Sequence, residues 1–404
     1  MTSTIKQRIE QIRRGEMPEG YKRTKAGVVP VEWKEVRIGD VLTQRKTLRC
    51  ISEDAPLLSF TIEEGVIDPA DKKSNKRDFL IKDITTKKFA LTEVGDIIYN
   101  PANLKFGAIH KNNLRRGVVS PIYGIFYGVQ NSTFMGYLLH NQRFIDYAKI
   151  YTEGTVEKLK TLNADTFKKL KITLPSLEEQ KKIAEILSAQ DKLSALKEKI
   201  LEEKKLKHKA LMQRIINDRD AGKLSSEKWV TRKLSDICEI VKGEQINKNV
   251  LLPTGDYYVL NGGVNPSGYS ESWNTEENTI SISEGGSTCG YVAYNSEKFW
   301  SGGHNYTLQN IQASVNKLYL YYFLKTNEES VMRLRVGSGL PNIQKSSLEC
   351  FKVFYPSFDA QSRIAKVLSS TGKEIELIQR QIYQEKQKKK ALMQLLLTGI
   401  ARTK

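Results

Sequence analysis

Few groups of residues in this sequence have the types and spacing that catalytic chemistry requires. The segment YNPAN at 99–103 comes nearest to the Asn/Asp-Pro-Pro-aromatic loop with which adenine methyltransferases hold a flipped base, but it lacks the second proline and the aromatic residue. The glycine-rich run GGSTCG at 285–290 is followed by Tyr291 and Val292, whereas a phosphate-binding loop requires Lys and then Ser or Thr after its last glycine. A β-turn is therefore the better interpretation of this run, and neither segment predicts catalysis.

Histidines and cysteines show no metal or redox pattern either. The sequence has four cysteines: Cys50, Cys238, Cys289 and Cys350. No CxxC pair or disulfide framework links them, so we expect reduced and mostly buried thiols. The four histidines, which are His110, His140, His208 and His304, have no ligand-like neighbours along the chain. Any triad or paired-carboxylate assignment would be arbitrary. We therefore expect a chain with no catalytic residue, metal or cofactor of its own.

The charge balance favours a polyanionic partner. Lys and Arg number 64 against 46 Asp and Glu, which gives a formal net charge of +18. Such an excess suits duplex DNA, RNA or an acidic membrane surface, although a basic protein with no anionic ligand remains the alternative. No run of 18 apolar residues is present, and the N-terminus has no apolar signal core, so we predict a cytoplasmic protein without a transmembrane helix.

Basic and amide side chains give the candidate DNA contacts, since Lys and Arg bind phosphates and polar side chains read base edges. In the first half of the chain the candidates are Lys72, Lys73, Lys76, Arg77, Asn100, Asn103, Lys105, Lys111, Asn112, Asn113, Arg115, Arg116, Lys158 and Lys160. In the second half they are Lys242, Lys248, Asn261, Ser283, Ser287, Asn305, Arg333, Arg335, Asn342 and Lys345. The competing interpretation is a solvated surface charge for each lysine. Turn chemistry is the favoured interpretation for Asn112 and Asn261, and a solvated helix face for the mixed-charge run 197–209.

These side chains need a scaffold, and the sequence provides one twice. Residues 174–216 align without a gap to residues 355–397, which lie 181 positions further on. Pro175 aligns with Pro356 and Gln180 with Gln361, and the tetrapeptide Ala-Leu-Met-Gln occurs at both 210–213 and 391–394. A repeat of this length indicates two copies of one supersecondary unit, and so pseudo-two-fold symmetry.

Both copies have the start signals and the apolar seam of a long helix. Ser176 and Glu179 form an S-x-x-E capping box, whereas Ala360 replaces the glutamate in the second copy. Gly372 inside the second copy costs about 1 kcal/mol relative to alanine. Forty residues make a rod of roughly 60 Å, and we expect the two rods to pack antiparallel as a coiled coil. The predicted helix-pair or subunit interface comprises Ile183, Ile186, Leu187, Leu196, Leu211, Met212, Ile364, Val367, Leu368, Ile375, Ile378, Ile382, Leu392 and Met393.

The remaining chain predicts two mixed α/β domains, and hence an α+β fold. Trp33 and Trp229 open two similar short stretches, after which the two regions differ almost everywhere. Short β-rich runs bounded by Gly, Asn or Pro are followed by helical segments at 133–149 and 316–334. We place an N-terminal helix and loop at 1–28, domains at 29–173 and 223–354, and the long helices at 174–222 and 355–404. The strand order is not readable from these patterns.

The chain resembles the specificity (S) subunit of type I restriction–modification enzymes. The resemblance rests on the LP…Q…IA…L opening at 174–187, its twin at 355–368, the KALMQ segment at 209–213, the two tryptophan openings and the segment GTVEKL at 154–159. It covers the chain by architecture, and by residue it is strong in the repeats and domain edges.

This resemblance implies a non-catalytic subunit in which two target-recognition domains each read one half of a bipartite, asymmetric double-stranded DNA site. It implies two bound methyltransferase (modification) subunits that use S-adenosylmethionine. Two restriction/translocase subunits that need ATP and Mg²⁺ can join them. The residues themselves leave open a coiled-coil adaptor and a two-headed DNA-binding repressor.

Overall fold

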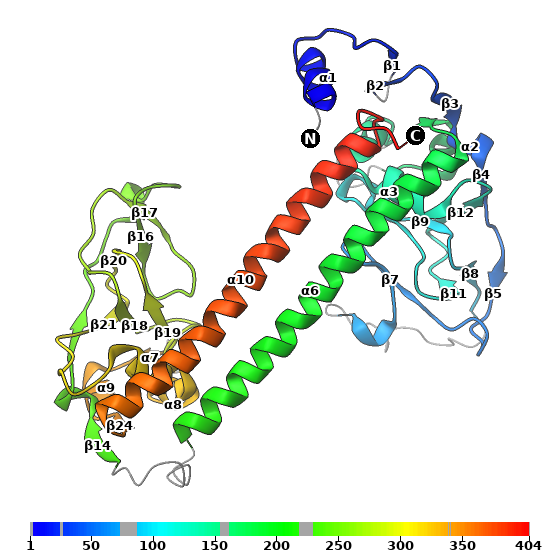
Figure 1. The fold of residues 1–404 in the computed structure, drawn as a ribbon. Coiled ribbons are helices and arrows are strands. Elements are labelled where there is room, and N and C mark those ends of the chain that lie inside the picture. The colour runs from blue at the N-terminus through cyan, green and yellow to red at the C-terminus, as the bar shows by residue number, and fades with distance from the viewer. Residues whose placement is uncertain are drawn as a thin grey trace. The chain divides into compact units, whose positions relative to one another are not determined.

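The computed structural model describes residues 3–24, 27–72, 87–153, 161–217, 229–337, 339 and 341–403. The chain divides into two compact units, residues 1–196 with 383–404, and residues 197–382 (Figure 1). Two long helices, α6 (Leu177–Asn217) and α10 (Phe358–Leu396), each contribute one part to either unit. The predicted long helices are therefore confirmed.

The first unit contains a four-stranded antiparallel sheet with the order β10-β9-β12-β4. These strands are β4 (Leu42–Gln44), β9 (Ile97–Tyr99), β10 (Ile109–Lys111) and β12 (Gly124–Gly128). A three-stranded sheet, β11-β8-β5, lies beside it and comprises β5 (Leu48–Arg49), β8 (Phe89–Thr92) and β11 (Gly117–Val119). A hairpin of β6 (Ser59–Thr61) and β7 (Gly65–Ile67) and the short helices α2 (Ile38–Val41) and α5 (Ala164–Lys169) complete the domain.

The second unit repeats the four-stranded arrangement with unrelated residues. Its sheet has the order β15-β21-β18-β19, formed by β15 (Glu239–Lys242), β18 (Thr279–Ser283), β19 (Val292–Asn295) and β21 (Asn305–Gln309). Numbered by their order along the chain, the four strands of both sheets are arranged third-second-fourth-first. The accompanying sheet differs, because β16 (Tyr257–Leu260) lies between β17 (Gly268–Ser270) and a parallel strand β20 (Trp300–Ser301). The remaining elements are β22 (Arg335–Val336), β23 (Asn342–Ile343) and α9 (Lys345–Glu349).

The helical segments predicted at 133–149 and 316–334 are each two helices, not one. α3 (Ser132–His140) ends at Asn141, whose side chain then accepts a hydrogen bond from the Arg143 N–H and so caps α4 (Gln142–Lys149). α7 (Lys317–Thr326) likewise ends at Asn327 before α8 (Glu328–Met332). Asparagine competes with helical backbone bonding, which explains why the chain turns at these residues.

In each domain the first strand pairs antiparallel with the last strand, which directly precedes the long helix. In the first unit β3 (Lys34–Arg37) pairs with β13 (Lys171–Leu174), and in the second β14 (Val230–Lys233) pairs with β24 (Lys352–Tyr355). The next backbone bond is also repeated, from Ile38 N to Leu170 O and from Leu234 N to Phe351 O. The chain therefore enters and leaves each domain in the same way.

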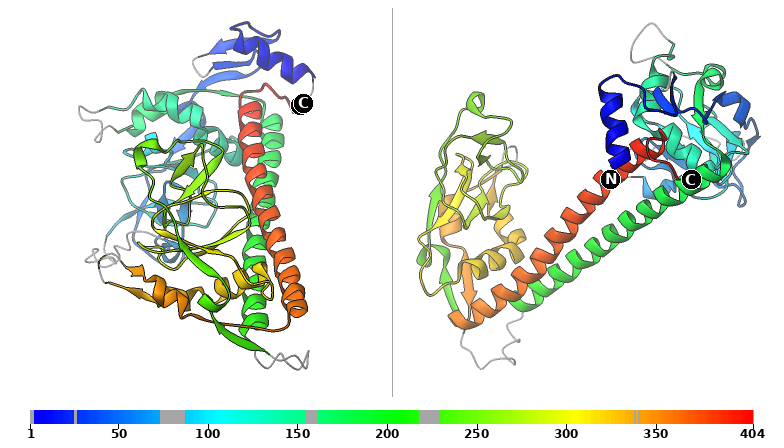
Figure 2. Two further views of the ribbon diagram at one scale, coloured as in Figure 1. Left: turned by 90° about the vertical axis from the view of Figure 1, so that its left-hand side faces the viewer. Right: turned by 45° about the horizontal axis from the view of Figure 1, so that its top comes forward.

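Within each unit the two long helices run antiparallel (Figure 2). In the first unit Lys389 pairs with Asp191, and Gln190 donates to Glu385 at 2.7 Å. In the second unit Lys204 pairs with Glu374 at 2.6 Å, and the His208 ring lies 2.7 Å from the Thr371 hydroxyl. Gly372 does not interrupt α10, since the remaining backbone bonds of the helix compensate for its low propensity.

The apolar ends of the repeat pack on the domain of their own unit. The first core contains Ile183, Ala184 and Leu187 of α6 together with Leu392, Met393, Leu396 and Leu397 near the end of α10. The second core contains Ile364, Ala365 and Leu368 together with Leu211, Met212, Ile215 and Ile216. These two sets correspond residue for residue across the 181-residue offset. Of the other predicted interface residues, Ile382 is buried and Ile375 and Ile378 are half-buried, whereas Ile186, Leu196 and Val367 are exposed.

The N-terminal segment lies against the C-terminal tail in the first unit. α1 (Ser3–Arg13), which the sequence predicts, precedes a hairpin of β1 (Tyr21–Thr24) and β2 (Gly27–Pro30). The Tyr21 hydroxyl donates to Gly399 O at 2.8 Å, and Arg8 donates to Ile400 O at 3.0 Å. No helix among the described residues is long and apolar enough to cross a membrane.

Candidate nucleic-acid interface

A buried glutamine fixes each domain to the start of a long helix. Gln180, 1% exposed, accepts a hydrogen bond from Asn131 N at 3.2 Å and donates to Pro175 O at 3.0 Å. Asn131 in turn caps α3, because its side chain accepts from Phe134 N at 2.9 Å. The position of the first domain on α6 is thus set by a series of hydrogen bonds as well as by apolar packing.

The second unit repeats these three hydrogen bonds. Gln361 is fully buried, accepts from Asn316 N at 2.8 Å and donates to Pro356 O at 3.0 Å and to Ser314 O at 3.1 Å. Asn316 caps α7 through Tyr319 N at 3.1 Å. The sequence marks both glutamines as repeated, but it gives no sign that they hold the domains.

The capping box predicted at Ser176 forms in part. Ser176 Oγ accepts from Glu179 N at 3.3 Å, as a capping serine should. The Glu179 carboxylate, however, accepts from Arg402 at 2.8 and 3.0 Å and from the Trp33 indole at 3.3 Å. Glu179 therefore ties the C-terminal tail to the helix, and this explains why Ala360 suffices at the equivalent position of the second copy.

The two candidate arginines of the first domain are held by carboxylates. Arg115 pairs with Asp68, and Arg116 pairs with Glu93 at 3.2 Å and with Asp54 at 3.5 Å. A hydrogen bond from the Ser52 hydroxyl to Asp54 and one from the Ala70 N–H to Asp68, together with the neighbouring arginines, hold the pKa values of both carboxyls below their usual range. Lys72 is half-buried, and Asn113 is exposed. Lys73, Lys76, Arg77, Lys158 and Lys160, with the segment GTVEKL, lie outside the described residues.

The asparagines of the first domain act in turns. Asn112 is fully buried, donates to Thr92 Oγ1 and Arg115 O, and accepts from Leu114 N, as the turn interpretation predicts. Asn100 accepts from Ala102 N at 3.0 Å, and Asn103 precedes the 3₁₀ turn η3 (Leu104–Phe106). Lys105 lies over the exposed Phe106 ring at 5.3 Å.

Lys111 lines a cavity of about 710 Å³ between the first domain and the helix pair of its own unit. Its ammonium donates to Thr133 Oγ1 at 2.8 Å, and burial lowers its pKa. The His110 and His140 rings lie 4.3 Å apart in the same wall. Other cations of the wall are Lys192, Lys386, Lys389 and Lys390. Burial lowers the pKa of His110 to about 4, so this imidazole is neutral at physiological pH.

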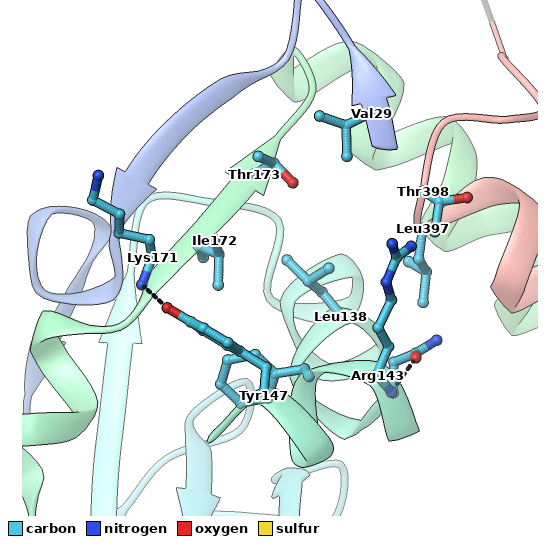
Figure 3. A pocket seen from close by; sticks show the side chains of 11 residues that line it. Val29, Leu138, Arg143, Tyr147, Lys171, Ile172, Thr173, Leu397 and Thr398 are labelled. Carbon is cyan, nitrogen blue, oxygen red and sulfur yellow. Dashed lines mark hydrogen bonds between the residues drawn. The ribbon is translucent and has the colours of Figure 1, made fainter. Parts of the chain in front are cut away.

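A second, much smaller cavity of about 50 Å³ lies behind the first domain, and it contains none of the predicted contacts (Figure 3). Leu138, Ile172 and Leu397 line it together with Thr173 and the Arg143 side chain. Burial lowers the pKa of Arg143. The cavity belongs to the packing of the domain against the C-terminal tail, and it is too small for a nucleotide.

The candidates of the second domain divide into buried and exposed groups. Ser283 and Asn305 are 3% exposed, and they donate to Gly262 O at 2.7 Å and to Ser301 Oγ at 3.1 Å. Asn261, half-buried, accepts from His304 N at 3.1 Å and so acts as a loop residue. The exposed candidates are Lys242, Lys248, Ser287, Arg333, Arg335 and Lys345, and Asn342 is half-buried. Lys242 also binds Glu284, a buried carboxylate that the sequence patterns did not single out.

The described residues contain no group of three or more His, Cys, Asp or Glu side chains that could hold a metal ion. Cys238 and Cys289 are buried, and burial raises the pKa of the Cys238 thiol to about 12. Cys50 and Cys350 are exposed, so the expectation of mostly buried thiols is wrong for half of them.

Two stretches of the chain, residues 30–205 and 226–386, match the family described as type I restriction modification DNA specificity domain. A putative type I specificity subunit from Mycoplasma genitalium is 34% identical over 150 residues, which are 37% of this chain and 39% of that protein. A similar protein from Mycoplasma pneumoniae is 35% identical over 147 residues, 36% of this chain and 39% of its own. These two alignments span about two-fifths of the relatives' length. The putative MjaX specificity subunit from Methanocaldococcus jannaschii is 24% identical over 441 aligned residues, 96% of this chain and 97% of its own.

Solved structures agree with the fold. The S subunit of a type I restriction–modification system from M. genitalium matches with a TM-score of 0.63 at 17% identity, over 90% of this chain and 96% of its own. A chain from a structure that addresses complex assembly and conformational transition of a type I system gives 0.56 at 15%, over 92% and 99%. Because the two matched stretches cover most of the 404 residues, the chain belongs to the type I restriction–modification DNA specificity family and carries that domain twice.

Proposed function

We propose that the chain is the non-catalytic specificity subunit of a type I restriction–modification complex and reads a bipartite, asymmetric DNA site. The observation that carries this proposal is the repeated mounting of two unlike domains. Gln180 and Gln361 fix domains of the same four-stranded order to equivalent helix starts. The accompanying sheets and the residues that the domains display differ, as two domains that read different half-sites require.

The charge of the chain supplies affinity and the domains supply selectivity. A net charge of +18 attracts the phosphate backbone, and this attraction weakens steeply with salt. The exposed cations Lys248 and Arg335 suit phosphate contacts. Two half-sites one helical turn apart are about 34 Å from centre to centre, a spacing that helices of 41 and 39 residues can span.

The methylation chemistry is assigned to partner subunits. Two methyltransferase subunits that bind S-adenosylmethionine dock on the helices, and restriction subunits that use ATP and Mg²⁺ complete the complex. An exposed apolar stripe on α6, formed by Ile186, Leu193 and Leu196 at 39%, 38% and 56% exposure, supports this docking. Its spacing of seven and three residues is that of a helix-packing seam.

Adenine-methylation sequencing of the host, with and without the gene for this chain, tests the proposal. We expect a single bipartite motif, methylated on both strands, to disappear with the chain and to return on complementation. Purification of the tagged chain should recover a methyltransferase subunit. An unchanged methylome would contradict the proposal, and sequence-specific binding without a methyltransferase would favour a repressor.

A further inference from the structure

A carboxylate in the second domain is buried with one oxygen unused. The Glu284 side chain, 9% exposed, follows β18 directly. Its Oε1 accepts from the Lys242 ammonium at 2.7 Å and from the Tyr306 hydroxyl at 3.0 Å. Its Oε2 is shielded from solvent and has no hydrogen-bond partner among the described residues. A buried acceptor left in this state is unfavourable by itself, which suggests that a bound state completes it.

His304 is the group placed to complete it. Its Nδ1 lies 3.8 Å from Glu284 Oε2, and its side chain is 63% exposed. Lys242, on the other oxygen, is 53% exposed. One buried carboxylate therefore lies behind two exposed nitrogen donors, Lys242 at the end of β15 and His304 in the turn before β21.

The backbone around this trio is fixed. Glu284 N donates to His304 O at 2.9 Å, and Ile343 N donates to Glu284 O at 2.8 Å. His304 N donates to the Asn261 side chain at 3.1 Å. The Lys242 ammonium is thus held by Glu284 and the backbone of His304 is fixed, whereas a phosphate-binding lysine needs only reach and charge.

Three glycine pairs, at 262–263, 285–286 and 302–303, lie around Lys242, Glu284 and His304, so no large side chain from these positions covers them. The loops touch each other through Ser283 Oγ, which donates to Gly262 O at 2.7 Å. A Cβ on Gly302 would lie 2.7 Å from Asn261 Oδ1, and one on Gly303 would lie 2.6 Å from Gln245 Oε1. Glycine in these loops permits both their close packing and the close approach of a ligand.

We propose that Lys242 and His304, oriented by Glu284, read a guanine in the half-site of the second domain; this rests on the proposed DNA-reading function. In the major groove guanine presents two acceptors, O6 and N7, whereas adenine and cytosine present an amino donor and thymine a methyl group. Two neighbouring donors therefore match guanine. In the bound state Nε2 of His304 donates to the base, while Nδ1 of the same ring faces Glu284 Oε2. Lys242 and His304 contact the base, and Glu284 is the positioning residue.

Binding of the intact complex, with its methyltransferase subunits, to its own site tests this proposal without any variant. Each guanine of the site is replaced in turn by 7-deazaguanine, which lacks the N7 acceptor. We expect one guanine, in one half-site only, at which this replacement weakens binding about tenfold or more. If no guanine responds, the proposal is overturned while the proposed function stands.

The variants Glu284→Gln, Lys242→Met and His304→Gln then identify the reader, with Lys317→Met on α7 as an exposed-lysine control. In the methylome of complemented hosts we expect that one guanine of the motif to become degenerate in the three variants, while the other half-site and the control motif stay unchanged. A motif that keeps every base but is methylated less would show a phosphate or structural role and overturn the proposal. A host whose methylome never depends on the chain would contradict the function itself.

Discussion

Gln361 accepts a hydrogen bond from the backbone N–H of Asn316, and 181 residues earlier Gln180 accepts one from Asn131. Each asparagine caps the first helix that packs on the sheet of its own domain, and each glutamine belongs to the first turn of a long helix. The same pair of residue types, a glutamine and an asparagine, therefore joins the domain to the long helix in both halves. The two domains can therefore differ in sequence as long as this hydrogen bond between glutamine and asparagine is kept.

The substitution Gln361→Met should destabilise the second unit. It leaves Asn316 N–H and the carbonyls of Pro356 and Ser314 without their buried partner, at a cost of about 1–3 kcal/mol. Urea unfolding of the purified chain measures the loss. Gln379→Met, on an exposed position of the same helix, is the matched control and should unfold like the wild type. Equal stability of both variants would contradict a fixing role for Gln361.

The substitution Arg402→Met should loosen the C-terminal tail. Arg402 donates to Glu179 at 2.8 and 3.0 Å and to Glu32 at 2.9 Å. Without Arg402, the Glu179 carboxylate, whose side chain is 7% exposed, is a nearly uncompensated buried charge. We expect the free energy of unfolding to fall by about 2–3 kcal/mol. Thermal denaturation and limited proteolysis of the tail report this change.

Removal of the partner charge should restore part of the lost stability. The double variant Arg402→Met/Glu179→Ala gives the first copy the residue that Ala360 supplies in the second. We expect it to melt at a higher temperature than Arg402→Met alone, because no unpaired carboxylate remains. If the two losses simply add, the ion pair does not anchor the tail.

The duplicated helices, their antiparallel pairing and the two mixed domains could be predicted from the sequence because the signals are long and periodic. Ile183 with Ile364 and Leu187 with Leu368, for example, occupy the same positions of the two apolar seams. The points at which an asparagine side chain competes for backbone hydrogen bonds and ends a helix are harder to predict. Asn141 and Asn327 divide segments that composition alone presents as continuous helices.

The candidate site was less predictable, because exposure and pairing are tertiary properties. Ser283 and Asn305 have the side chains of base readers but lie inside the sheet, and Asn112 closes a turn. Glu284 carries no sequence signal, since one glutamate beside a glycine pair resembles any loop residue. Its burial beneath Lys242 becomes visible only when β15 and β18 are brought into one sheet.

Acid should destabilise the first unit through His110. Burial lowers the folded-state pKa of this imidazole to about 4, against an ordinary value near 6.5. Below pH 6.5 the unfolded chain binds a proton that the folded chain does not, so stability falls as the pH drops from about 6.5 towards 4. The full effect is about 3 kcal/mol. Urea unfolding at pH 7 and pH 5 should show a smaller acid loss for His110→Gln than for the wild type.

The substitution Gly372→Ala should stabilise the chain, because α10 continues through this residue. A Cβ at this position would meet only the Tyr322 hydroxyl at 3.5 Å, an ordinary contact, and would restrict the unfolded chain. We expect a gain of about 0.5–1 kcal/mol. Gly136→Ala in α3 is the contrasting variant, since its Cβ would lie 3.1 Å from Lys111 Cβ and should give no such gain. Calorimetric melting of the two variants distinguishes them.

The exposed stripe of α6 should govern assembly rather than folding. Leu193 and Leu196 are 38% and 56% exposed, so Leu193→Lys/Leu196→Asp removes little from the core of the chain. A partner helix packed on this face would instead have to bury two charges, which is strongly unfavourable. We therefore expect an unchanged melting temperature but at least about tenfold weaker methyltransferase binding, which corresponds to a loss of about 1.4 kcal/mol. Glu203→Lys, an exposed charge change on the same helix, is the control and should bind normally. Full methyltransferase binding by the double variant, measured by co-purification and calorimetry, would exclude this face of α6 as the docking surface.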